Sequence, residues 1–157
     1  MDAIRVIVDS REKPQAIRLI TAYFDRHGIE WERAALKTGD YMAEGKPGLV
    51  IDRKANLGEL AMNLCSADRR RFYNEIRRAH DQNIRLVILC EHGGDIRGLA
   101  DVPKWKNRYG KVSGRRLQDE IYKLQIGYGV PVLFCDKRST GRRIIEILTE
   151  GNDGQGN

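Results

Sequence analysis

The sequence predicts an α/β domain in which helices flank a mixed central β-sheet. Apolar runs of strand type alternate along the chain with amphipathic segments of helical spacing. Two extended segments within residues 39–54 are close enough to form a hairpin, which adds antiparallel pairing to the sheet. The chain of 157 residues is long enough for one domain with a substantial core. We expect that domain to span residues 1–150.

The strands are expected at short apolar runs bounded by charged residues or turn residues. In the hairpin, Lys46, Pro47 and Gly48 are typical of a turn, and the apolar run 49–51 begins the returning strand. The strand after the central helices ends at Glu91. The expected strands are 4–8, 29–36, the two strands of the 39–54 hairpin, 84–90 and 130–135.

The helices are expected where apolar residues recur three or four positions apart. Pro14 suits the first turn of the first helix, and Gly28 suits its end. Asn56, Asp68 and Ser113 are suited to cap the next three helices. The apolar helix faces are Ile17, Ile20 and Phe24, then Phe72, Ile76 and Ala79, then Leu117, Ile121, Leu124 and Tyr128, and finally Ile144, Ile145 and Leu148. Residues 151–157 contain only small and polar types and predict a disordered tail.

Composition narrows the class of protein. The net charge of +6 and the pI of about 9.4 favour a polyanionic partner. We expect no membrane span, because no apolar run reaches 18 residues, and no signal peptide, because charges begin at Asp2. Cys65, Cys90 and Cys135 are too widely spaced for a zinc site and are typical of buried thiols in a reducing compartment.

Acidic residues close three of the expected strands: Asp9 with Glu12, then Asp52, then Glu91. Ligands of α/β sheets gather at the carboxyl ends of strands. The hairpin brings Asp40 beside Asp52. Side chains alternate along a strand, so Asp52 shares a face with Lys54, and Arg53 faces the other way. Two carboxylates and one ammonium are the layout of a metal-dependent phosphodiesterase.

The alternative to a catalytic site is an ordinary charged strand end that faces water. An acid-x-Lys triplet occurs easily by chance, and the chain holds a second one, Glu44-x-Lys46, in the expected turn. The triplet at Asp52 differs from it because it closes an apolar strand and follows a Gly-Asp pair.

Four motifs occur in an order that resembles the nuclease domain of the XPF family of structure-specific DNA endonucleases, in the PD-(D/E)XK superfamily. The resemblance covers about residues 6–91 and implies a restriction-endonuclease-like fold. The motifs are Val8-Asp9-Ser10-Arg11-Glu12, Gly28-Ile29, Gly39-Asp40-Tyr41 and Ile51-Asp52-Arg53-Lys54.

The chain departs from the family pattern at two positions. The Glu of the family's Glu-Arg-Lys is Asp52 here, and the Asp expected further on is Gly58, with Glu59 one place later. The chain also lacks the helicase-like and helix-hairpin-helix regions of the large eukaryotic members. It therefore resembles stand-alone versions from phages and prophages, for which the cytoplasm of a bacterial or phage-infected cell is the expected location.

The resemblance implies Mg²⁺-dependent hydrolysis of DNA phosphodiester bonds at branched or otherwise structured DNA, with Mn²⁺ as a substitute metal. Mg²⁺ prefers hard oxygen ligands and lowers the pKa of bound water. Lys54 would hold the attacking water or stabilise developing charge, and Arg53 would fix the site through an ion pair. The implied metal ligands are Asp40 and Asp52, with Asp9 and Glu12 for a second metal or for orienting water; Glu59 and Glu91 are further candidates.

The expected partners are DNA, a second copy of the chain and an accessory DNA-binding protein. Candidate DNA contacts are Arg11, Arg69 and Arg71, although arginine runs in helices are more often solvated faces. The homodimer surface is expected in residues 130–148. The alternative function is a catalytically inactive DNA-binding or partner subunit of a nuclease complex.

A basic and aromatic stretch lies in the long loop expected at residues 93–114. Lys104, Lys106 and Arg108 are interleaved with Trp105 and Tyr109. Such a stretch can stack on unpaired bases, or it can be a loop that Trp105 anchors.

Overall fold

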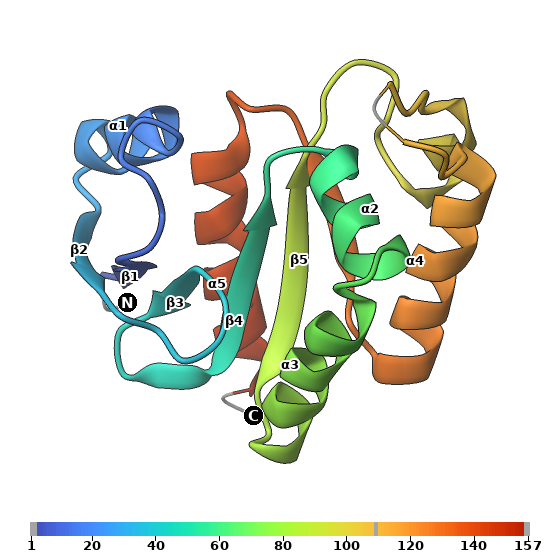
Figure 1. The fold of residues 1–157 in the computed structure, drawn as a ribbon. Helices are drawn as coiled ribbons and strands as arrows, with labels where there is room; N and C mark the ends of the chain where they lie inside the picture. Colours follow the sequence, from blue (N-terminus) through green and yellow to red (C-terminus); the bar gives the residue numbers. More distant parts are fainter. Residues whose placement is uncertain (1–2, 109, 156–157) are drawn as a thin grey trace.

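A computed structural model describes residues 3–108 and 110–155 as a six-stranded mixed sheet in the order β2-β1-β3-β4-β5-β6 (Figure 1). Only β3 is antiparallel to its neighbours, so the other five strands end at one edge of the sheet. The strands are β1 (Arg5–Asp9), β2 (Glu30–Ala34), β3 (Tyr41–Ala43), β4 (Lys46–Lys54), β5 (Arg85–Glu91) and β6 (Val132–Cys135). The expected mixed α/β architecture is confirmed.

Helices cover both faces of this sheet. The helices are α1 (Arg18–Arg26), α2 (Leu57–Cys65), α3 (Arg69–Asp81), the 3₁₀ helix η1 (Leu99–Lys104), α4 (Gly114–Tyr128) and α5 (Thr140–Gln155). The first core cluster joins α2, α3 and α4 to one face of the sheet, and the second joins α1 and α5 to the other face. In Figure 1, α2 and α3 lie in front of β4 and β5, with α5 behind.

The alternation of β4 decides which residues reach which face. Val50 belongs to the front cluster with α2 and α3, whereas Leu49 and Ile51 belong to the rear cluster with α1 and α5. The same period carries Asp52 and Lys54 to the front face and Arg53 to the rear face. The hydrophobic packing of β4 therefore sets the orientation of the polar residues at its end.

The hairpin turn lies earlier than the sequence predicts. Glu44 and Gly45 form the turn, and residues 46–48 already belong to β4. Gly45 takes a φ of +77°, which glycine adopts at no steric cost. Pro47, which has no N–H to donate, is accommodated because pairing with β5 begins only at Leu49.

The observed helix boundaries confirm two predicted N-terminal caps. They differ from the expectation at Asp68 and at the start of the first helix. The side chains of Asn56 and Ser113 accept backbone hydrogen bonds that cap α2 and α4. Asp68 precedes α3 without a capping bond from its side chain, and its N–H donates to Ser66 Oγ over 3.1 Å. The first α-helix begins at Arg18, after turns that contain Pro14.

Helix α5 extends into the segment 151–157 that the sequence predicts to be a disordered tail. It continues to Gln155, and residues 156–157 lie outside the described residues. Within the helix, the buried Asn152 donates to Leu148 O over 2.7 Å. Arg85 on β5 donates to Gly151 O over 3.0 Å, which ties this glycine-rich part of the helix to the sheet.

In the described part of the chain, no helix is both long and apolar enough to cross a membrane.

The three cysteines are free thiols, and burial raises the pKa of Cys90 to about 12.

Close packing of η1 against the start of α4 predicts a specific sensitivity at Gly114. A Cβ atom at this position would lie 2.5 Å from Val102 O and 2.8 Å from Pro103 O, which are backbone atoms. Gly114→Ala is expected to lower the free energy of unfolding by about 1–3 kcal/mol, measured by urea denaturation. The control is Gly127→Ala in the same helix, where a Cβ meets no atom within 4 Å. It should stabilise by up to about 1 kcal/mol, and equal effects of the two changes would contradict the packing argument.

Candidate active site

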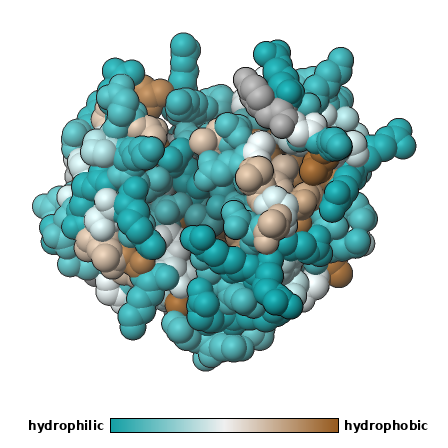
Figure 2. Space-filling view, in the orientation of Figure 1, coloured by the Kyte–Doolittle hydropathy of each residue, from teal (hydrophilic) through white to brown (hydrophobic). Residues whose placement is uncertain are grey.

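A polar cleft of about 360 Å³ opens on the front face of the sheet. One wall is the end of β4 with the segment that precedes β3, and the other wall is α3. Figure 2 shows hydrophilic residues surrounding a hollow in the centre of this face. The cleft is lined by Asp9, Arg11, Glu12, Lys37, Thr38, Gly39, Asp40, Asp52, Lys54, Phe72, Glu75, Ile76, Arg78 and Leu86.

Asp40 is fixed beside the end of β4 by three backbone contacts. Its N–H donates to Ile51 O over 2.7 Å, and its carbonyl accepts from Asp9 N over 2.8 Å. Its Oδ2 accepts from Arg53 N over 2.8 Å. Gly39 makes this close approach feasible, because it has a φ of +72° and a Cβ would lie 3.1 Å from Ile51 O.

Asp40 and Asp52 form a crowded carboxylate pair. Burial, followed by the neighbouring charge of Asp52, raises the pKa of Asp40 to about 9. The expected approach of Asp40 to Asp52 is therefore present. At neutral pH the metal-free pair therefore keeps one proton, which a bound cation would displace.

Lys54 completes this group of side chains from the same face of β4. Its Nζ lies 3.2 Å from Asp52 Oδ2 and 5.4 Å from the centre of the Phe72 ring on α3. The lysine is buried, and the carboxylate and the aromatic face hold its ammonium in place. The placement predicted from strand alternation is confirmed.

Arg53 forms a buried network on the opposite face. Its guanidinium donates to both carboxylate oxygens of Glu12, over 2.8 and 3.1 Å, and also to Glu91 Oε1. Thr140 donates to the other Glu91 oxygen over 2.6 Å. Burial lowers the pKa of Arg53, but the bonds to Glu12 and then Glu91 outweigh this and raise it. Glu12 and Glu91 therefore hold Arg53 and fix β4. Glu12 also lines the cleft, and its charge contributes to the raised pKa of Asp40. The metal-binding roles of Glu12 and Glu91 stay predictions.

Asp9 also has a positioning contact at each oxygen. Its Oδ1 accepts from Leu36 N over 3.0 Å, and its Oδ2 accepts from Arg11 Nε over 2.9 Å. Arg11 in turn donates to Leu36 O over 2.9 Å, and 72% of its side chain is exposed. Asp9 thus anchors the segment that carries Asp40, while Arg11 presents a guanidinium at the rim of the cleft.

Two predicted site residues, Glu59 and Arg69, make structural contacts, and their functional roles stay predictions. Glu59 Oε2 accepts from Ala55 N over 2.9 Å, and its N–H donates to Asn56 Oδ1, which is a reciprocal cap at the start of α2. Arg69 donates to Glu120 Oε2 over 2.7 Å and joins α3 to α4. Both predictions came from positions in the sequence, and neither residue lines the cleft.

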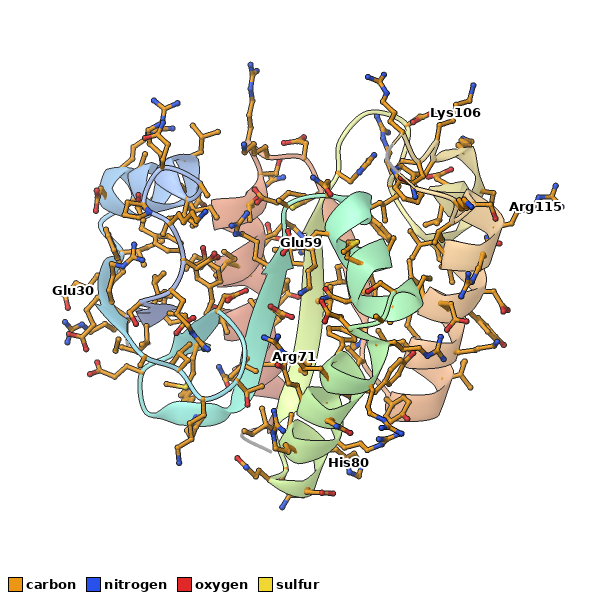
Figure 3. The ribbon with its side chains drawn as sticks, viewed as in Figure 1. Glu30, Glu59, Arg71, His80, Lys106 and Arg115 are labelled. Carbon is orange, nitrogen blue, oxygen red and sulfur yellow. The ribbon has the colours of Figure 1, made fainter. Side chains whose placement is uncertain are left out.

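Arg71, a predicted DNA contact, lies near the start of α3. Its side chain is 80% exposed, and its ion pair with Glu75 is long at 3.8 Å. Figure 3 shows it between α3 and β4. A surface pair of this kind contributes little stability and leaves the guanidinium available.

Sequence reasoning missed four polar or aromatic residues that line the cleft: Lys37, Thr38, Phe72 and Glu75. A usable signal existed for three of them. Lys37 and Thr38 directly precede the Gly39-Asp40 pair, and Glu75 follows Arg71 at a helical spacing of four.

The carboxylate pair fits Mg²⁺ better than a metal that needs a full set of protein ligands. Within residues 3–108 and 110–155, no group of three or more His, Cys, Asp or Glu side chains could hold a metal ion. Mg²⁺ is commonly bound by one or two carboxylates, with water and substrate phosphate completing its shell. Asp40 and Asp52 supply that ligand set.

The surface expected to form a homodimer packs within the chain itself. Val130, Val132, Ile144 and Leu148 are buried in the two core clusters. The homodimer stays a prediction. The molecular mass of the protein in solution, measured by analytical ultracentrifugation, tests it.

The mixed sheet flanked by helices, with Asp52 and Lys54 at the end of β4 and Asp40 beside them, defines the class of protein: an α/β domain with a nuclease-type fold. The family model described as "ERCC4 domain" matches residues 8–148. The chain therefore belongs to the ERCC4 domain family, a family of DNA endonuclease domains. This confirms the resemblance to XPF-type nucleases.

Solved structures with the same fold support the assignment. XPF from Aeropyrum pernix is 21% identical with a TM-score of 0.68, over 94% of this chain and 61% of that chain. XPF from Aeropyrum pernix in complex with DNA is 20% identical with a TM-score of 0.68, over 96% of this chain and 66% of that chain. The chain thus spans less than two thirds of either protein. A comparison with curated proteins finds no match.

The raised pKa of Asp40 predicts a pH-dependent effect of Asp40→Asn. The folded protein keeps this proton to about pH 9, whereas the unfolded chain releases it near pH 4. Between these values the folded state binds more protons, so metal-free stability falls as pH rises. Asparagine does not titrate, so Asp40→Asn should gain in Tm over the wild type as pH rises from about 4 to 9, measured in EDTA. Asp119→Asn, at an exposed carboxylate on α4, is the control. A Tm difference that is constant with pH would contradict the assignment.

Proposed function

We propose that this domain is a Mg²⁺-dependent endonuclease that hydrolyses phosphodiester bonds of branched or otherwise structured DNA. The observation that carries the proposal is the group formed by Asp40, Asp52 and Lys54 on one face of a cleft, in a chain of the ERCC4 domain family. Mn²⁺ is expected to substitute for Mg²⁺, because both are hard cations that prefer oxygen ligands.

Asp40 and Asp52 would hold the metal, which supplies charge neutralisation at the phosphate and a lower pKa for bound water. Lys54 places a buried ammonium 3.2 Å from Asp52 Oδ2, where it can hold a water or stabilise charge that develops on the phosphate. Arg53 acts from the rear face as a positioning residue, because its backbone N–H and side chain fix Asp40 and the end of β4.

Cations on both walls of the cleft suit a DNA backbone. Lys37 and Arg11 lie on one wall and Arg78 on the other, with Arg71 exposed beside it. Contacts between such cations and phosphates position a nucleic acid without reading its sequence. This arrangement supports recognition of DNA shape.

Replacing any one of Asp40, Asp52 and Lys54 should abolish most cleavage. Asp40→Asn and Asp52→Asn keep the side-chain shape but remove charge from the metal ligands. Lys54→Ala leaves the carboxylates and removes the ammonium. Each is expected to lower the cleavage rate on the order of 100-fold or more, measured with branched, nicked and single-stranded DNA in Mg²⁺.

The control is Lys46→Ala, which changes an exposed lysine of the second acid-x-Lys triplet and should cut normally. Ca²⁺ should support DNA binding without cleavage. Cleavage in EDTA, or near-normal cleavage by Asp52→Asn, would show that the assigned site is wrong. A wild-type protein that binds DNA but does not cut in Mg²⁺ or Mn²⁺ would establish the inactive-subunit alternative.

Arg71→Ala should weaken binding to duplex DNA in Ca²⁺ by a similar factor for all sequences. The slope of log affinity against log salt should become shallower by about 0.9, for one phosphate contact. Arg26→Ala on α1, an exposed position on the opposite side of the sheet, is the matched control. An unchanged salt slope for Arg71→Ala would remove this residue from the binding surface.

A further inference from the structure

A second cleft, of about 480 Å³, lies beyond the end of β4. It is lined by Asn56, Gly58, His92, Asp95, Ile96, Lys104, Trp105, Lys106, Asn107 and Arg108. Lys54 lines the catalytic cleft and Asn56 lines the second cleft, so Ala55 alone lies between these two residues in the chain. Such a segment spans at most about 7 Å, which makes the two clefts neighbours.

The charge of this second cleft is predominantly positive. Lys106 and Arg108 are exposed, and neither side chain makes a hydrogen bond or ion pair with the described residues. Lys104 is paired with Asp101 over 3.1 Å. Asp95 is the one carboxylate among the residues that line the cleft. Figure 3 shows Lys106 above and to the right of α2. The two available cations suit an anionic ligand.

Trp105 gives the cleft an aromatic surface that is held in place. Its ring is half-buried and packs against the front core cluster, and its backbone N–H donates to Val102 O over 2.9 Å at the end of η1. The packing restricts the ring, which lowers the entropic cost of ordering it on a ligand. Packing explains where the ring sits, but it does not explain why available cations flank it.

His92 contributes a hydrogen-bond donor. Its Nδ1 accepts from Leu57 N over 3.2 Å, and burial lowers its pKa, so the neutral ring carries its hydrogen on Nε2. The cleft therefore combines cations, an aromatic ring and a neutral donor. Each of these suits one part of a nucleotide.

We propose that this second cleft binds an unpaired stretch of the DNA strand whose phosphate occupies the catalytic cleft. Trp105 stacks on a base, while Lys106 and Arg108 bind the flanking phosphates. Stacking on an aromatic ring needs an exposed base face, which a duplex does not offer. The inference rests on the proposed function for the identity of the ligand, and it assigns the single-stranded side of the substrate to this face.

The fluorescence of Trp105 tests this proposal directly. The chain has two tryptophans, and Trp31→Phe leaves Trp105 as the remaining one. Trp31 lies on β2, where its Nε1 donates to Asp25 over 2.9 Å, away from both clefts. In this background and in EDTA, a short oligothymidylate should quench the fluorescence, and a duplex of equal length should quench it much less. No quenching by the single strand, or equal quenching by the duplex, would overturn the proposal.

The cations are tested with a double variant. Lys106→Ala with Arg108→Ala should weaken oligothymidylate binding and reduce the salt slope by about 1.4, at about 0.7 for each phosphate on a single strand. Arg18→Ala with Arg26→Ala removes two exposed cations from α1 and should change neither quantity. If both double variants behave alike, the second cleft does not bind the strand.

Cleavage assays separate this inference from the proposed function. Asp52→Asn should lose cleavage but keep the quenching of Trp105, because it alters only the catalytic cleft. The wild type could fail to cut in Mg²⁺ and Mn²⁺ while the single strand still quenches Trp105 and the double variant still binds it more weakly. The second cleft would then be a binding site, and the proposed nuclease activity would be wrong. If the wild type cuts but the single strand does not quench, the nuclease stands and this inference fails.

Discussion

The buried contacts of Arg53 with Glu12 and Glu91 are the constraint on which the site depends. They tie the segment after β1 to β4 and to the end of β5, and Thr140 extends the network to α5. Removing one partner of a buried ion pair leaves an uncompensated charge that costs about 3–5 kcal/mol. The network is therefore expected to hold the strand ends in one arrangement. Because Arg53 lies between Asp52 and Lys54, whatever fixes its position also fixes theirs.

The charged side chains on the front and rear faces of β4 form two separate groups. On the rear face, Arg53 pairs with two carboxylates, those of Glu12 and Glu91, and Thr140 donates to the remaining Glu91 oxygen. On the front face, two carboxylates share one lysine, and the pKa of Asp40 is raised to about 9. The two groups hold the same charges, but the front group has a carboxyl with a strongly raised pKa in a cleft, which is typical of a functional site. The contacts of Arg53 hold the end of β4, and with it the front group, in place.

The net charge of +6 does not show which cations are paired within the fold and which are available to a ligand. Several arginines are used within the fold, such as Arg69 with Glu120 and Arg5 with glutamates of β2. The cations that remain available include Arg71 beside the catalytic cleft and Lys106 in the second cleft. Both clefts lie on the face covered by α2 and α3, as the proposed binding of one continuous DNA strand requires.

The sequence by itself determined the features that depend on local periodicity. Strand alternation placed Asp52 and Lys54 together, helical spacing identified the buried faces, and Asn56 and Ser113 were recognised as caps. The tertiary structure decided which charges meet across the chain. Glu12 and Glu91 lie 41 and 38 positions from Arg53, and Glu120 lies 51 positions from Arg69. It also decided that α5 continues through the glycines to Gln155, where contacts with the sheet override weak helix propensity. Period and capping are set by neighbours in sequence, whereas the partner of a charge is set by which strand ends and helices pack side by side.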